Sequence, residues 1–115
     1  NYLTELDLIS KMLPISLLQD NDPNFDNKLE YVKKNLVTLN HSQQYIDEVE
    51  KKCHDLEDGF GKFDNINDIY YSKDSFLAAL LCVEAVHRGI NSIINEQEGL
   101  LTRGYSITRP PGHHA

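Results

Sequence analysis

The feature that most constrains this chain is an apolar run within a long helical pattern. Residues 76–83 (FLAALLCV) are apolar on every face of a helix that Asp74 and Ser75 can cap and that runs to about Asn95. Because a helix segment without a polar face is stable only under the cover of other elements, we expect this run to be buried. Its eight residues are too few to cross a membrane, which takes roughly 20, and no secretion signal opens the chain.

Length and composition indicate a folded chain of one domain or less. The 115 residues are 40% hydrophobic and 25% charged, as in ordinary globular proteins. The net charge of −7 repels phosphate backbones, so we expect no direct nucleic-acid binding, and a basic protein or peptide is the easier partner. Cys53 and Cys82 have no metal or disulfide spacing, and we interpret them as reduced thiols of a cytosolic or nuclear protein.

Periodicity and turn residues predict further elements. Ser42 begins a helix that fades near Cys53, and residues 54–67 are loop-like. The other expected elements are an amphipathic helix at Thr4–Leu13, a helix capped by Asn24 with Phe25, Leu29 and Val32 on one face, and short strands at Leu36–Leu39 and Gly104–Thr108. A buried helix, a loop and a strand followed by chemically capable residues are typical of the α/β class, to which we assign the chain.

The densest group of chemically capable residues is RPPGHHA at residues 109–115. Its two prolines lack N–H donors and restrict φ, which makes the segment stiff and non-helical, while Gly112 permits a backbone conformation that a side chain would forbid. Adjacent histidines seldom bind one metal ion, whereas imidazoles exchange protons near neutral pH. The pattern therefore favours acid/base chemistry by His113 and His114. A solvated pair or a tag remnant is the alternative, and the Pro-Pro-Gly lead-in disfavours a tag.

The remaining candidates have simpler interpretations. His41 lies beside a helix cap and is expected to satisfy local backbone groups. His87 lies on the long helix and is expected to be a boundary residue. Cys53 and His54 are adjacent, but a single Cys-His pair is a weak metal signal. The loop is expected to be solvated or, alternatively, to form a rim that attracts basic substrate tails, and its acidic residues are Asp55, Glu57, Asp58 and Asp64.

Three segments match, in order, the motifs of one enzyme family. They are LNHSQQYI at residues 39–46, Asp68-Ile69-Tyr70 followed by Asp74-Ser75-Phe76, and RPPGHHA at residues 109–115. Together they resemble the strand-to-helix segment, the substrate loop with its following helix, and the active-site segment of zinc-dependent histone deacetylases, particularly the class II and fungal branch. The resemblance covers residues 36–115.

The resemblance implies the arginase/deacetylase fold, a mostly parallel sheet flanked by helices, and hydrolysis of an acetylated lysine side chain. It implies that zinc polarises the amide carbonyl and activates a water, while His114 acts as general base and then acid and His113 assists. Asp68 matches the carboxylate that accepts the substrate backbone N–H, and the neighbouring Asn67 is a weaker acceptor in the alternative register.

The family's zinc ligands and oxyanion-stabilising tyrosine are expected beyond Ala115. By the resemblance, residues 1–115 are the N-terminal portion of a single catalytic domain, incomplete in this chain and without metal ligands of their own. The expected substrate is an acetylated histone or other acetylated protein, with an acetylpolyamine or a catalytically inactive scaffold as alternatives. We further expect a nuclear or cytoplasmic protein, or one in both compartments, in a multiprotein or homo-oligomeric complex and without membrane contact.

Overall fold

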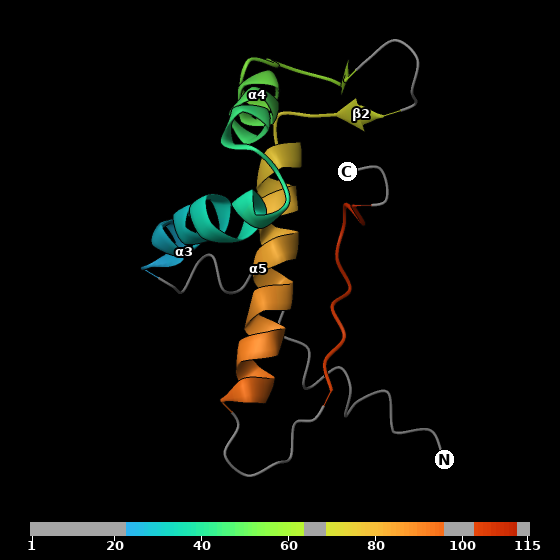
Figure 1. Cartoon of the computed structure of the whole chain (residues 1–115). Helices are drawn as coiled ribbons and strands as arrows, with labels where there is room; N and C mark the ends of the chain where they lie inside the picture. The colour runs from blue at the N-terminus through green and yellow to red at the C-terminus, as the bar shows by residue number, and fades with distance from the viewer. Residues whose placement is uncertain (1–22, 64–68, 96–102, 113–115) are drawn as a thin grey trace, which may run out of the picture.

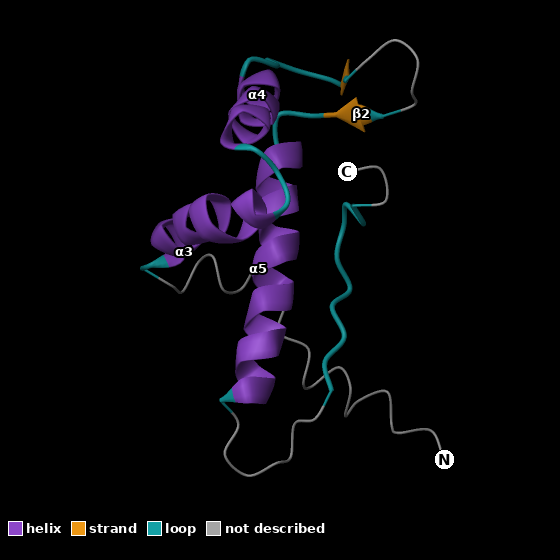
Figure 2. Ribbon diagram, in the orientation of Figure 1, coloured by secondary structure: helices purple, strands orange, loops and turns teal. Residues whose placement is uncertain are grey.

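The computed structural model describes residues 23–63, 69–95 and 103–112. Its longest element is helix α5, Ser75–Ile94, and the other elements are arranged along it (Figure 1). Helix α4 lies near the start of α5, and α3 crosses its middle (Figure 1). The helix expected at Thr4–Leu13 lies outside the described residues. Figure 2 shows that helix dominates the described part of the chain, with one small pair of strands.

The first helical layer is one continuous path of three helix types. Helix α3, Phe25–Tyr31, continues as the π-helix η1, Val32–Leu36, and ends in the 3₁₀ turn η2, Val37–Leu39. Phe25 and Val32 are buried, as their common face predicts, although the side chain of Asn24 makes no capping hydrogen bond.

The strand expected at Leu36–Leu39 is wrong, because this segment is helical. The carbonyl of Val37 accepts hydrogen bonds from the N–H groups of Asn40 and His41 at 3.2 and 3.1 Å, which closes the turn. Four residues are too few for their β-branched character to decide the conformation. The preceding helix packs on α5, and this packing favours a helical backbone in the residues that follow it.

Helix α4, Gln43–His54, begins and ends as its sequence predicts. The Ser42 hydroxyl accepts a hydrogen bond from the N–H of Tyr45 at 3.2 Å, which satisfies one of the free donors of the first turn. Ile46 and Cys53 are buried on the face toward the rest of the molecule. The opposite face carries exposed charges, including the Lys52–Glu48 ion pair at 2.9 Å.

A small antiparallel hairpin occupies part of the expected loop. Strand β1, Gly61–Lys62, pairs with β2, Tyr70–Tyr71, in the register Gly61 to Tyr71 and Lys62 to Tyr70. The aromatic ring of Tyr71 lies over Gly61 so closely that a Cβ atom there would clash with it. The ring also packs against Phe63 with a centroid separation of 4.7 Å. Glycine, which marks a loop in the sequence, therefore makes room for an aromatic ring in the structure.

Helix α5 has the predicted bounds, but the expectation that its first half is buried is wrong for the described residues. Leu80 is buried at 7% exposure, whereas Leu77 is 37% exposed. By length and composition alone the helix could cross a membrane, with 11% of its most apolar window buried, although the core helix of a soluble protein meets the same criterion. The described elements cover α5 on only part of its circumference.

Residues 103–112 form an extended segment that runs back along α5 (Figure 1). Residues 104–108, where a strand was expected, have an extended backbone. They pair with no described strand, so the expected strand does not form among the described residues. The two-stranded β1–β2 hairpin is the only sheet among the described residues. The mostly parallel sheet expected from the resemblance is therefore not observed in this part of the chain.

Candidate functional site

Two contacts align the extended segment antiparallel to α5. At its beginning, a Cβ atom on Gly104 would lie 3.3 Å from Cδ1 of Ile93, in the last turn of the helix. At its far end, the thiol of Cys82 donates a hydrogen bond to the carbonyl of Arg109 with an Sγ–O distance of 2.9 Å. The segment therefore travels from the end of α5 toward its beginning.

The Pro-Pro-Gly lead-in has the conformation that its residues predict. Residues 109–112 are non-helical, and Gly112 has a φ angle of +73°, in the region that side-chain-bearing residues rarely adopt. The peptide bond between Arg109 and Pro110 is cis. His113 and His114 follow Gly112 directly in the chain and lie outside the described residues.

The Pro-Pro-Gly segment forms one wall of an apolar groove of about 760 Å³. Helix α5 supplies Phe76, Leu80 and Val83 to this groove, and α4 supplies Tyr45 and Ile46. Gly112 lines the same groove as Phe76, which is in the first turn of α5. The described residue next to His113 therefore lies close to the N-terminal end of α5.

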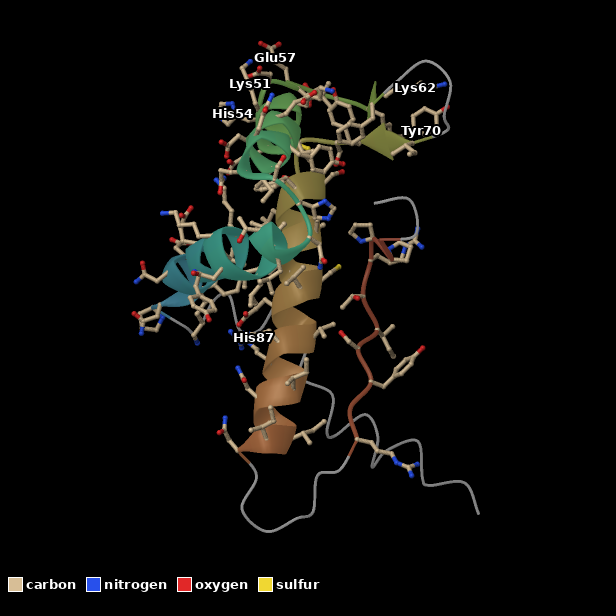
Figure 3. All side chains as sticks on the ribbon, viewed as in Figure 1. Lys51, His54, Glu57, Lys62, Tyr70 and His87 are labelled. Atoms are coloured by element: carbon tan, nitrogen blue, oxygen red, sulfur yellow. The ribbon has the colours of Figure 1, made fainter. Side chains whose placement is uncertain are left out.

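The hairpin places Ile69, the described neighbour of Asp68, near the N-terminal end of α5 as well. Asp68 and the alternative Asn67 lie outside the described residues, but Ile69 follows Asp68 in the chain and leads through β2 into α5. Exposed aromatic and basic side chains surround this hairpin, and the Lys62 ammonium lies 4.9 Å from the ring centroid of Tyr70 (Figure 3). The described neighbours of Asp68 and His113 thus share one end of the long helix.

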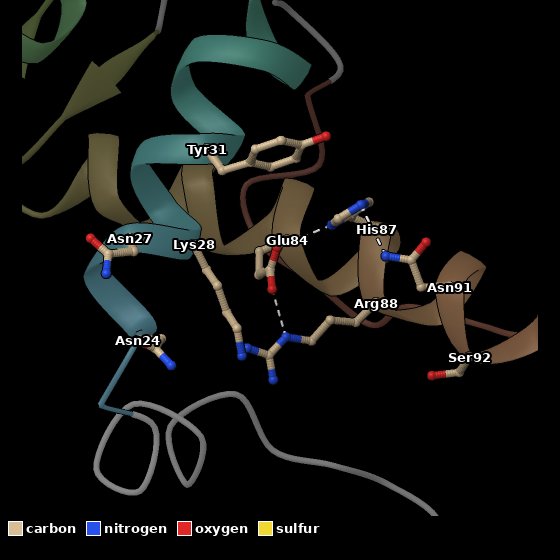
Figure 4. Close-up of a pocket in the computed structure, with 9 residues that line it drawn as sticks. All are labelled: Asn24, Asn27, Lys28, Tyr31, Glu84, His87, Arg88, Asn91 and Ser92. Atoms are coloured by element: carbon tan, nitrogen blue, oxygen red, sulfur yellow. Dashed lines mark hydrogen bonds and ion pairs between the residues drawn. The ribbon is translucent and has the colours of Figure 1, made fainter. Parts of the chain in front are cut away.

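A second cluster, on the middle of α5, was not predicted from the sequence. Glu84 is 4% exposed, and its carboxylate accepts a hydrogen bond from Nε of Arg88 at 2.6 Å (Figure 4). Nδ1 of His87 lies 3.4 Å from the other carboxylate oxygen of Glu84, and Nε2 of His87 lies 3.0 Å from Nδ2 of Asn91. Both ring nitrogens of His87 therefore have a polar neighbour on the same helix.

The Glu84 cluster borders a shallow cavity of about 540 Å³ between α3 and α5 (Figure 4). The ring of Tyr31 stacks on His87 with a centroid separation of 5.9 Å, which connects the cluster to α3. The sequence signal for this cluster is a glutamate directly after the apolar run 76–83, followed by arginine four positions later. The expectation that His87 is a boundary residue is confirmed, since its side chain is 30% exposed.

The His41 side chain makes an aromatic contact but, among the described residues, no hydrogen bond to the local backbone groups that it was expected to satisfy. His41 packs its ring against Tyr45 with a centroid separation of 5.4 Å. His54 is 88% exposed and lies 3.6 Å from the carboxylate of Asp55. Both cysteines are free thiols, and burial raises the pKa of the Cys53 thiol, which keeps it protonated and unreactive near neutral pH.

The described residues do not form a metal site. Within residues 23–63, 69–95 and 103–112, no group of three or more His, Cys, Asp or Glu side chains could hold an ion. The Cys53–His54 pair accordingly has no further ligands in that part of the chain. A zinc ion therefore does not fit the described residues.

Comparison with known protein families decides the assignment. The family model described as the histone deacetylase domain matches residues 6–115. The chain belongs to the histone deacetylase domain family. The match to this deacetylase domain extends over the Glu84 cluster and both groups of predicted site residues. Searches of curated proteins and of solved structures gave no match.

Membership of the deacetylase domain family shows the fold of the domain and its general type of activity. The domain has the arginase/deacetylase fold, of which the described residues are a helix-rich part with one antiparallel strand pair. The activity of such a domain is of the deacetylase type, a hydrolysis. Zinc dependence is general in this family, although the described residues contain no metal-binding group.

Proposed function

We propose that this protein hydrolyses the acetyl-lysine amide of acetylated proteins, as a lysine deacetylase of the class II-like, fungal-type branch. The observation that carries the proposal is the family match through residue 115, which includes the RPPGHHA segment. The convergence of Gly112 and the hairpin toward one end of α5 supports it, because it would bring a proton-transfer group near a substrate-binding loop.

The proposed roles follow from the chemistry of each side chain. His114 takes a proton during attack on the amide and returns it to the leaving amine, which suits an imidazole with an ordinary pKa near neutrality. His113 assists by orienting or electrostatically tuning its neighbour. Asp68 accepts the N–H of the substrate backbone, and a carboxylate forms such a bond more strongly than the neutral amide of Asn67.

The proposal includes zinc on the ground of family membership alone. From the family resemblance we assign its ligands, and the tyrosine that stabilises the oxyanion, to residues beyond Ala115. On this proposal residues 1–115 are the N-terminal portion of one catalytic domain.

The substrate and setting of the enzyme belong to the same proposal. The net charge of −7 favours basic, lysine-rich segments such as histone tails and disfavours direct nucleic-acid binding. Asp55, Glu57 and Asp58 lie between α4 and the hairpin, where they would add negative charge to the approach of a basic tail. We propose a nuclear or cytoplasmic location, or both, in a multiprotein or homo-oligomeric complex without membrane contact.

The test is steady-state kinetics on the full-length natural protein, with an acetyl-lysine peptide and an acetylpolyamine as competing substrates. We expect zinc-dependent turnover of the peptide, and a loss of about 10² to 10⁴ in kcat for His114→Ala with the zinc content unchanged. Asp68→Ala should raise KM as well as lower kcat, because it removes a contact to the substrate.

Each contrary result has a distinct meaning. Preferential turnover of the acetylpolyamine would assign the small-amide reaction instead. Absence of turnover on both substrates would leave a deacetylase-like scaffold and reject the proposal. Loss of zinc from the His114→Ala or His113→Ala protein would replace the acid/base role with metal ligation.

A further inference from the structure

Cys82 makes a contact that links α5 to the segment before the histidine pair. Its Sγ lies 2.9 Å from the carbonyl oxygen of Arg109, a residue 27 positions away in the chain. We propose that Cys82 is a positioning residue, whose thiol holds the Arg109 carbonyl and thereby orients the lead-in to His113 and His114. This inference rests on the proposed function, in which those two histidines move protons.

The Cys82 thiol gives the extended segment a side-chain contact with the long helix. Among the described residues, no backbone hydrogen bond joins residues 103–112 to another part of the chain. Pro110 and Pro111 have no N–H to donate, so they cannot complete a backbone ladder. The Cys82 thiol supplies a donor to this stretch from the neighbouring helix.

The hydrogen bond between Cys82 and Arg109 lies where it can influence the orientation of the segment before the histidines. Arg109 directly precedes two prolines whose rings restrict backbone rotation, so an orientation set at its carbonyl is carried along the chain. Cys82, Pro110, Pro111 and Gly112 all line the apolar groove, so this solvent-exposed hydrogen bond fixes the extended segment to the helical wall of the groove. Only Gly112 separates this restrained stretch from His113.

A purely structural role for Cys82 makes different predictions. Cys53, the other of the two cysteines, is buried at 1% exposure on α4, so its replacement should affect stability rather than the histidine pair. Cys82 is only partly buried, and its distinguishing feature is the donor. Valine matches the size of cysteine without a donor, and serine keeps a donor with a shorter reach.

The experiment compares Cys82→Val, Cys82→Ser and the matched control Cys53→Val in the full-length protein. We expect Cys82→Val to lower kcat roughly 3- to 10-fold with KM within about twofold of the wild type, and Cys82→Ser to recover at least about half of the lost kcat. Cys53→Val should lower the Tm and leave kcat within about twofold.

A spectroscopic measurement keeps the inference testable if the protein shows no deacetylase turnover. With ¹³C label at the Cε1 positions of its histidines, the Cys82→Val protein should shift the His113 and His114 resonances, and Cys82→Ser should restore them. His54, which is 88% exposed and does not line the groove, should stay unchanged as an internal control. Unchanged His113 and His114 signals, an unchanged kcat in an active Cys82→Val protein, or equal losses in the valine and serine variants would overturn the inference.

Discussion

The carboxylate of Glu84 is the one charged group that the described part of the chain buries almost completely. Burying a carboxylate is costly unless charged partners and hydrogen bonds replace its water. Arg88 and His87 supply them from the next turn of the same helix, and Tyr31 covers His87 from α3. Through His87 and Tyr31, the Glu84 cluster therefore connects α5 to α3 in the first helical layer.

We expect Glu84→Gln to lower the free energy of unfolding by about 1–3 kcal/mol, because Arg88, at 26% side-chain exposure, loses its charged partner. Urea unfolding measures the change. The matched control is Glu48→Gln, which removes the exposed ion pair with Lys52 and should cost under about 0.5 kcal/mol. Equal effects of the two substitutions would show that burial of Glu84 adds nothing.

At the scale of elements, the start of α4 depends on one hydroxyl. Ser42 has an extended backbone with a ψ angle of 149°, and its Oγ accepts the N–H of Tyr45. This cap sets the direction in which the chain leaves η2, so that Ile46 faces inward. By contrast, the side chains of Asn24 and Asp74 make no capping bond at the starts of α3 and α5.

Ser42→Ala should therefore lower the free energy of unfolding by about 1 kcal/mol, and Ser42→Asp should retain most of it, because aspartate caps as well as serine. The control is Asp74→Ala, which removes no capping hydrogen bond and should change stability by less than about 0.5 kcal/mol. Thermal unfolding followed by circular dichroism separates these cases. A larger loss for Asp74→Ala than for Ser42→Ala would contradict the assignment of the cap.

At the scale of the whole molecule, three elements meet at Lys33. From η1, its ammonium forms an ion pair with Glu50 on α4 and lies 5.8 Å from the ring centroid of Phe76 on α5. The hydrogen bond to Glu50 raises the pKa of Lys33 above the usual lysine value, and burial partly opposes this rise. The folded protein therefore binds this proton more tightly than the unfolded chain does.

The raised pKa predicts a pH window for this stabilisation. A group whose pKa is raised on folding contributes its full stabilisation below its unfolded pKa, and the contribution disappears as pH rises through the folded pKa. We expect Lys33→Met to lower the free energy of unfolding by about 0.5–1 kcal/mol at about pH 8, a small value because Glu50 is 41% exposed. This difference should disappear as the pH rises through the folded pKa of Lys33.

Urea unfolding of both proteins at several pH values measures this difference. Comparing wild type with variant cancels the ionisation of tyrosines over the same range. The control is Lys34→Met, which removes an exposed pair with Glu30 within one helical path and should cost less at every pH. A difference between wild type and Lys33→Met that stays constant with pH would refute the role assigned to the Lys33 ammonium.

The sequence by itself determined the features that depend on residues within a turn or two of one another. The helix that Ser42 caps, the bounds of α5, and the non-helical Pro-Pro-Gly stretch with its unusual Gly112 conformation are as predicted. Capping, apolar periodicity and restricted φ angles act locally, so they can be read without knowing the rest of the fold. The deacetylase family was recognisable for the related reason that its motifs are contiguous. Asp68, His113 and His114 lie outside the described residues, so their roles stay predictions.

Only the tertiary structure decided the features that depend on distant parts of the chain. Packing on α5 made residues 36–39 helical where local composition predicted a strand. Gly61 pairs with Tyr71 in the hairpin, and Cys82 forms a hydrogen bond with Arg109. Neither contact can be predicted from a local sequence pattern. The exposure of α5 likewise depends on which elements cover it, because burial is a property of neighbours in space rather than of neighbours in sequence.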